Sequence, residues 1–241
     1  MASYPRYAIY YAAPRGDALD RFGAQHLGYD AWSGDDLPFP RGLPPDWREL
    51  TSDPRKYGFH ATLKAPFALA PGESESELIA ACADFARMPR VVPVIAPVVA
   101  SISGFIAVVP AQPSDELVRF ADDCVRVFDA FRAPLTPEDR SRRRPDKLTE
   151  RQRDYLDRWG YPYVMDEFRF HMTLTGRLDS ARRGQVLDLL NKRFQGIGVK
   201  SLAIDGIALF KQADAEERFR VMAAWRLEGM LRGHGIMGLK T

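Results

Sequence analysis

The pentapeptide Phe-His-x-Thr-Leu occurs twice in this chain of 241 residues, at positions 59–63 and 170–174. In an extended strand successive side chains point to opposite faces, so each His shares a face with its Thr. The Phe, the central Ala or Met and the Leu then form the other face, which is apolar. The repeat therefore predicts two half-buried β-strands, each presenting an imidazole and a hydroxyl on its polar face.

The four polar residues of the repeat, His60, Thr62, His171 and Thr173, are the candidate site. An imidazole exchanges a proton near neutral pH, and a hydroxyl two residues away can donate a hydrogen bond to an anionic oxygen. Two such strands brought together would place paired acid–base groups around a phosphate. A single strand histidine is usually structural, and it is the matched second copy that favours the functional interpretation.

Two basic residues next to the motifs are candidate phosphate contacts. Strand alternation predicts that Lys64 shares the face of the first motif, and Arg169 flanks the second motif on its polar face. Surface salt bridges explain both residues equally well. The remaining histidines, His26 and His234, have no comparable context and are interpreted as structural.

The segments that follow the two motifs have the same order. A capping box at Ser74 predicts a helix after the first motif, and a hairpin is predicted over 91–109. A helix from Ser180 and a hairpin over 204–227 follow the second motif. His171 lies 171 − 60 = 111 positions after His60. We expect an α+β fold with two pseudo-symmetric lobes, each an antiparallel β-sheet with helices on its outer face, around a central cleft. Residues 1–241 would form this single two-lobed domain, with one motif per lobe.

The segments outside this repeat are predicted more simply. Helices are expected to begin near residues 114, 137 and 149, and residues 28–55 are predicted to form a long ordered loop anchored by aromatic side chains. The basic run 140–144 lies between two aspartates and is interpreted as a solvated helix face, with guidance of a nucleic-acid or phosphorylated ligand as the alternative. The aromatic residues Phe105, Trp159, Tyr161 and Tyr163 are interpreted as packing residues, with stacking on a sugar or base as the alternative.

Charge and cysteine usage limit the partners. The 34 basic and 32 acidic residues give a formal net charge of +2, so the chain has no large field for coating DNA or another polyanion. Cys82 and Cys124 both lie on apolar helix stripes, where a free thiol behaves as a small hydrophobe. Together with the absence of a leader pattern and of a long apolar stretch, this predicts a cytoplasmic protein without a membrane partner.

Several familiar catalytic patterns do not occur in the sequence. There is no Cys-x-x-Cys or His-Glu-x-x-His pattern for a metal, no Gly-x-Ser-x-Gly nucleophile elbow and no Gly-x-x-x-x-Gly-Lys phosphate loop. We therefore expect no metal and no cofactor.

The two motifs, with the flanking stretches 57–64 and 159–171, closely resemble those of the two-histidine phosphoesterase superfamily. Within it the chain is most similar to the bacterial branch found beside phosphonate-degradation genes. The resemblance implies a metal-independent cyclic phosphodiesterase or an RNA 2′,5′-ligase-like enzyme. It further implies that one of His60 and His171 acts as general base and the other as general acid, while Thr62 and Thr173 hold nonbridging phosphate oxygens.

The leading hypothesis is an enzyme that opens a small ribosyl or nucleoside cyclic phosphate. One alternative is an RNA-end enzyme acting on 2′,3′-cyclic phosphate or 2′,5′-linked termini, although RNA would require a longer basic track than this near-neutral chain displays. The other alternative is a noncatalytic sugar-phosphate binding protein, which would not need two proton-transfer groups. The substrate, the roles of the two histidines and the oligomeric state are left open by the sequence.

Overall fold

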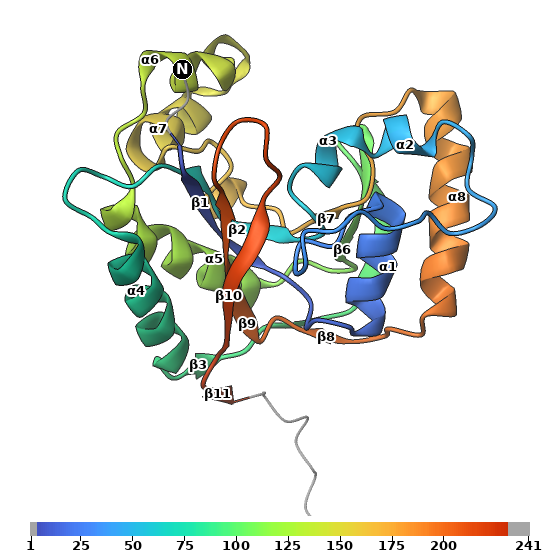
Figure 1. Ribbon diagram of the computed structural model, residues 1–241, viewed down its shortest axis with the longest axis horizontal. Coiled ribbons are helices and arrows are strands. Elements are labelled where there is room, and N and C mark those ends of the chain that lie inside the picture. Colours follow the sequence, from blue (N-terminus) through green and yellow to red (C-terminus); the bar gives the residue numbers. More distant parts are fainter. Residues whose placement is uncertain (1–3, 231–241) are drawn as a thin grey trace, which may run out of the picture.

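A computed structural model describes residues 4–230 of the chain, and His234 lies outside the described residues (Figure 1). Its centre is a seven-stranded sheet in which every neighbouring pair of strands is antiparallel. The strand order is β10-β9-β1-β2-β7-β6-β5. The bounds are β1 Arg6–Tyr11, β2 Ala61–Phe67, β5 Pro97–Ile102, β6 Phe105–Pro110, β7 Met172–Thr173, β9 Gly206–Gln212 and β10 Arg220–Arg226.

Helices pack against both halves of this sheet, which confirms the predicted α+β class. Helices α4 and α5 contact strands β9, β10 and β2, whereas α8 contacts β5 and β6 at the other edge (Figure 1). The helices are α1 Ala18–Leu27, α2 Trp47–Leu50, α3 Ser52–Arg55, α4 Glu75–Arg87, α5 Asp115–Phe128, α6 Pro137–Arg142, α7 Glu150–Trp159 and α8 Ser180–Gly196. Short 3₁₀ turns cover η1 Asp129–Phe131, η2 Pro145–Lys147 and η3 Met165–Glu167. Two small sheets join β3 Arg90–Val91 to β11 Gly229–Met230 and β4 Val94–Ile95 to β8 Leu202–Ala203.

The two motif strands, β2 and β7, are neighbours at the centre of the sheet. The hairpin that follows the first motif, β5–β6, pairs with the strand of the second motif. The hairpin that follows the second motif, β9–β10, pairs through β1 with the strand of the first. The two halves of the sheet therefore exchange hairpins, so neither half is one continuous stretch of sequence.

Local sequence signals account for most element boundaries. Ser74 and Thr149 both form complete capping boxes at the starts of α4 and α7, and Thr136 caps α6 with Pro137 at its first helical position. The β5–β6 turn contains Ser103 and Gly104 at φ values of 50° and 92°, as a tight hairpin with positive φ at both central residues requires. Strand β5 begins at Pro97, which has no backbone N–H to donate, and it lies at the edge of the sheet, where a proline is tolerated.

The segment 28–55 departs from the prediction of a loop, because it contains the four-residue helices α2 and α3. Helices this short leave no periodic pattern in a sequence. They are held by buried contacts instead: the Trp47 indole donates to the His26 carbonyl at 2.7 Å, and the Arg55 guanidinium donates to the Leu27 carbonyl at 2.6 Å. His26 itself is buried and its Nδ1 lies 2.7 Å from the Phe22 carbonyl oxygen, which agrees with a structural role.

The main core lies on one face of the sheet and includes Ile9 and Tyr11 of β1 together with both cysteines. Cys82 of α4 and Cys124 of α5 are fully buried, and burial raises the pKa of the Cys82 thiol to about 12. Both thiols thus pack as small hydrophobes, as predicted. Over residues 4–230 the structure contains no helix with the length and apolar character needed to cross a membrane.

Candidate active site

The register between β2 and β7 brings the two His-Thr motifs together. Ala61 lies directly opposite Met172, and both side chains are fully buried on the core face. Continuing this antiparallel register places His60 opposite Thr173 and Thr62 opposite His171. All four polar side chains then lie on the opposite face from Ala61 and Met172. Each imidazole therefore has the threonine of the other motif as its cross-strand neighbour.

His60 is held in a defined orientation. Its Nδ1 lies 3.0 Å from the Gly58 carbonyl oxygen, which fixes the proton on Nδ1 and leaves the Nε2 lone pair available. The Thr62 hydroxyl lies 3.3 Å from that Nε2. The imidazole also stacks on Tyr10, with ring centroids 3.7 Å apart. Burial lowers the pKa of His60 to about 4, and the proximity of His171 adds to this shift, while the bond to Gly58 opposes it.

His171 has the same arrangement on the neighbouring strand. Its Nδ1 lies 2.7 Å from the Arg169 carbonyl oxygen, again two residues earlier in the chain, so its Nε2 is also available. The Phe105 ring lies beside it at 5.5 Å between centroids. Burial lowers the pKa of His171 and the bond to Arg169 opposes the shift. Both imidazoles are therefore neutral at neutral pH when no anion is bound.

A cavity of about 320 Å³ opens beside the second motif. Its wall includes Thr62 and His171 from the two motif strands and the β5–β6 turn around Ser103. Gln152 of α7 and Glu167 of η3 also line it, and the Gln152 amide donates to Glu167 at 2.9 Å. The cavity has the size of a small-ligand site.

The expectation that Lys64 shares the face of Thr62 is wrong. Thr62 lies opposite Tyr10 of β1, but Lys64 lies opposite Ile9, the preceding residue, because the register shifts by a β-bulge between these pairs. Ile9 and Tyr10 point to opposite faces, so Lys64 and Thr62 do as well.

The core face gives Lys64 a different partner. Its side chain is buried and its ammonium group pairs with the Asp129 carboxylate at 2.5 Å. Burial lowers the pKa of Lys64 to about 8, although the bond to Asp129 opposes this shift. The structure therefore does not bring Lys64 to the other candidate residues.

Arg169 does line the cavity, and its side chain is exposed. A second exposed arginine, Arg177, lines the same cavity and was not identified from the sequence. It lies on the segment between β7 and α8, beyond any recognisable motif. The described residues include no carboxylate within 4 Å of either guanidinium, so both are free to meet an anion.

Several aromatic residues lie at the candidate site. Phe105, Tyr161 and Tyr163, interpreted from the sequence as packing residues with stacking on a sugar or base as the alternative, line the cavity. Tyr161 and Tyr163 meet edge to face with centroids 5.6 Å apart. The pairing of β1 with β2 places Tyr10 against His60. Only the pairing, which the sequence did not specify, identifies this contact.

The chain is an α+β protein in which neighbouring antiparallel strands bring two His-Thr motifs together. Thr62 and His171 line the adjacent small cavity, whereas His60 and Thr173 are not among its lining residues. Residues 62–220 match the family model DUF1045, described as a protein of unknown function. The match spans more than half of the chain, and the protein belongs to this family.

Two curated relatives carry the same name, ribose 1,5-bisphosphate phosphokinase PhnN. The protein from Janthinobacterium sp. (strain Marseille) is 34% identical over 220 residues, which are 87% of this chain and 48% of the relative. The protein from Laribacter hongkongensis (strain HLHK9) is 34% identical over 221 residues, which are 90% of this chain and 50% of the relative. The chain thus spans about half the length of the curated relatives it matches.

Among solved structures, E. coli LigT complexed with 3′-AMP is similar at 14% sequence identity and a TM-score of 0.41. The similarity covers 93% of this chain and 99% of that chain.

Proposed function

We propose that this protein is a phosphoesterase of the two-histidine type that opens a small ribosyl or nucleoside cyclic phosphate. The observation that carries the proposal is the β2–β7 register, which sets His60 opposite Thr173 and Thr62 opposite His171. Two imidazoles with free Nε2 atoms on neighbouring strands supply a base and an acid on either side of one phosphate. The threonine hydroxyls and the free arginines at the cavity supply donors for its nonbridging oxygens.

The reaction follows from these groups. The Nε2 of one neutral imidazole takes a proton from water as the water oxygen forms a bond to phosphorus. The bond between phosphorus and one ring ester oxygen breaks, and the other imidazole, protonated at Nε2, gives its proton to that leaving oxygen. The product is a single phosphate monoester with one free hydroxyl. Both imidazoles are neutral without ligand, so the negative charge of the bound substrate must raise the pKa of the acid.

We assign the base to His60 and the acid to His171. His60 is stacked under Tyr10 and its pKa is lowered to about 4, which favours the neutral form. His171 lies at the cavity with two free arginines, where a bound phosphate would be its nearest anion. An anion beside an imidazole stabilises its protonated form.

The names of the curated relatives support a phosphorylated ribose as the substrate class, since both relatives are named for ribose 1,5-bisphosphate. The kinase activity in those names is not supported for this chain, which has no Gly-x-x-x-x-Gly-Lys loop and matches about half of each relative. The sequence resemblance to the branch beside phosphonate-degradation genes agrees with the same ribose chemistry.

A leaving-group experiment tests the assignment of the two histidines. An ester with a p-nitrophenolate leaving group does not need protonation, so His171→Ala should retain much more activity on a nucleoside p-nitrophenyl phosphodiester than on a cyclic phosphate. His60→Ala should lose activity on both, because both reactions require an activated water. Equal losses on the two substrates for His171→Ala, with a rescue for His60→Ala, would reverse the assignment.

A further inference from the structure

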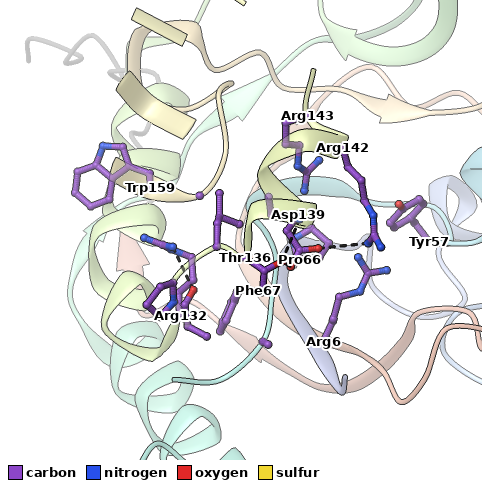
Figure 2. A pocket seen from close by; sticks show the side chains of 16 residues that line it. Arg6, Tyr57, Pro66, Phe67, Arg132, Thr136, Asp139, Arg142, Arg143 and Trp159 are labelled. Carbon is purple, nitrogen blue, oxygen red and sulfur yellow. Dashed lines mark hydrogen bonds and ion pairs between the residues drawn. The ribbon is translucent and has the colours of Figure 1, made fainter. Parts of the chain in front are cut away.

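A second pocket of about 250 Å³ lies at the end of β2 (Figure 2). It is formed by the start of β1, the end of β2, the segment that leads into α6, and the end of α7. Figure 2 shows the side chains of Arg6, Arg142 and Arg143 directed toward the same space, beside the ring of Tyr57.

The lining of this pocket is strongly basic. It contains four arginines and one aspartate, so its formal charge is 4 − 1 = +3. Arg142 pairs with Asp139 at 3.3 Å, and Arg132 pairs at 2.7 Å with Asp129, a carboxylate that it shares with Lys64. Arg6 and Arg143 are the two lining arginines that form no ion pair within the described residues.

The contacts of these two cations are neutral. The Arg6 Nε donates to the Gln212 side-chain oxygen at 3.0 Å, and Arg143 lies over the Tyr161 ring at 5.0 Å. Within the described part of the chain no carboxylate approaches either guanidinium to 4 Å. Two such guanidiniums facing one pocket repel each other and favour an anion between them.

The arginine pocket adjoins the His60 side of the candidate site. Tyr57 lines the pocket, and its ring centroid lies 6.2 Å from that of His60. Tyr161, under Arg143, lines the cavity beside His171. Ala65 of β2 lines both spaces. The arginine pocket therefore lies next to a small molecule that binds at the two His-Thr pairs.

We propose that Arg6 and Arg143 bind a second, terminal phosphate of the substrate, while the His-Thr pairs act on its cyclic phosphate. A phosphate monoester carries a charge of about −1.5 to −2 at pH 7, which matches the two cations left without counter-charge. The substrate would then be a sugar or nucleoside cyclic phosphate that also bears a phosphomonoester. This inference deepens the proposed function and rests on it for the identity of the reacting group.

The kinetic test compares adenosine 2′,3′-cyclic phosphate with the same compound bearing a 5′-monophosphate. The 5′-phosphate should lower KM about ten- to a hundredfold in the wild type. Arg143→Gln should remove most of this advantage and leave the rate on the unphosphorylated substrate unchanged, and Arg6→Gln should remove most of the advantage as well. Arg144→Gln is the matched control, because Arg144 belongs to the same basic run, is exposed and does not line the pocket.

A third substrate distinguishes the source of the phosphate. A dinucleotide with a 2′,3′-cyclic end carries an internal diester in place of the terminal monoester. If the KM of this dinucleotide is as low as that of the 5′-monophosphate compound, or lower, the terminal-monoester proposal is overturned in favour of an RNA end. A 5′-phosphate advantage that survives in both arginine variants also overturns it.

A binding measurement separates this proposal from the proposed function. Titration calorimetry with ribose 5-phosphate requires no turnover, so it reports on the pocket even if no cyclic phosphate is opened. We expect binding by the wild type and Arg144→Gln and about tenfold or greater loss in Arg143→Gln. Equal binding by all three proteins would overturn the subsite, whereas normal binding without turnover of any cyclic phosphate would contradict only the proposed reaction. Arg143→Gln is the decisive variant, because Arg6 also bonds Gln212 of β9 and its replacement can affect the fold.

Discussion

At the scale of single residues, each imidazole is oriented by its own strand. Both Nδ1 atoms bond the carbonyl two residues earlier, Gly58 for His60 and Arg169 for His171. This local bond selects the tautomer in which Nε2 is free, without any carboxylate partner. The sequence predicted that each histidine shares a strand face with the threonine of its own motif, because strand alternation fixes which side chains share a face. It did not predict the stacking of Tyr10 on His60, which depends on the pairing of β1 with β2.

The threonine hydroxyls should matter for binding the transition state. A hydrogen bond to a charged oxygen contributes about 1.5 to 3 kcal/mol, so we expect Thr62→Ala and Thr173→Ala each to lower kcat/KM roughly ten- to a hundredfold. Steady-state kinetics on a cyclic phosphate measures this loss. Unchanged kinetics in both variants would remove the threonines from the proposed site.

The depressed pKa of His60 also predicts how stability depends on pH. In the unfolded chain this imidazole takes up a proton near pH 6.5, but in the folded protein it does so only near pH 4. Between these values the unfolded state binds more protons, so the folded protein loses stability as the pH falls through this window.

His60→Asn should therefore flatten the dependence of the unfolding free energy on pH between about 6.5 and 4. Denaturant unfolding at several pH values measures the slope, with Thr62→Ala as a control that keeps the imidazole. If wild type and His60→Asn show the same slope, folding does not lower the pKa of His60.

At the scale of elements, the sequence predicted the two motif strands, most of the longer helices and both hairpins, because capping boxes, prolines and apolar periodicity are local signals. It did not predict the exchange of hairpins between the two halves of the sheet, which depends on long-range pairing. It also could not reveal the β-bulge in β2 that turns Lys64 to the core, since a bulge breaks the alternation on which the prediction relied. The ion pair of Lys64 with Asp129 joins β2 to the end of α5.

This ion pair should contribute to stability and not to substrate binding. Removal of one partner from a buried pair costs about 3 to 5 kcal/mol. Asp129→Asn should approach that cost, because it leaves the Lys64 ammonium buried; Lys64→Met should cost less, because Asp129 keeps its bond to Arg132. Denaturant unfolding measures both, with the exposed Lys56→Met as control. A marked rise in KM in a folded Lys64→Met variant would show instead that Lys64 reaches the substrate.

At the scale of the whole molecule, two motifs that are far apart in the sequence lie side by side because β2 and β7 are neighbouring strands of the antiparallel sheet. In the proposed reaction the side chains of these motifs transfer protons and donate hydrogen bonds, and no step requires a metal. We therefore expect exhaustive chelation to leave the activity intact, and metal analysis of the purified protein to find no stoichiometric zinc or manganese. A rate that falls on chelation and returns with one divalent ion would contradict this expectation.

The charge distribution of the whole chain predicts the size of the substrate. A near-neutral chain with one local arginine pocket should show a weak salt dependence on small cyclic phosphates, because few counterions are released. Rates on mononucleotide and oligonucleotide 2′,3′-cyclic phosphates at several salt concentrations measure this. A large preference for the oligonucleotide that disappears at high salt would favour the RNA-end alternative.

In the proposed reaction two imidazoles on neighbouring strands perform the proton transfers. Hydrolysis of a ribosyl or nucleoside cyclic phosphate by wild type, His60→Ala and His171→Ala tests this most directly. We expect a single monoester product and a bell-shaped dependence of kcat/KM on pH for the wild type. In each variant we expect kcat/KM to fall by roughly 100-fold or more with the fold retained. Near wild-type turnover by either folded variant would contradict it.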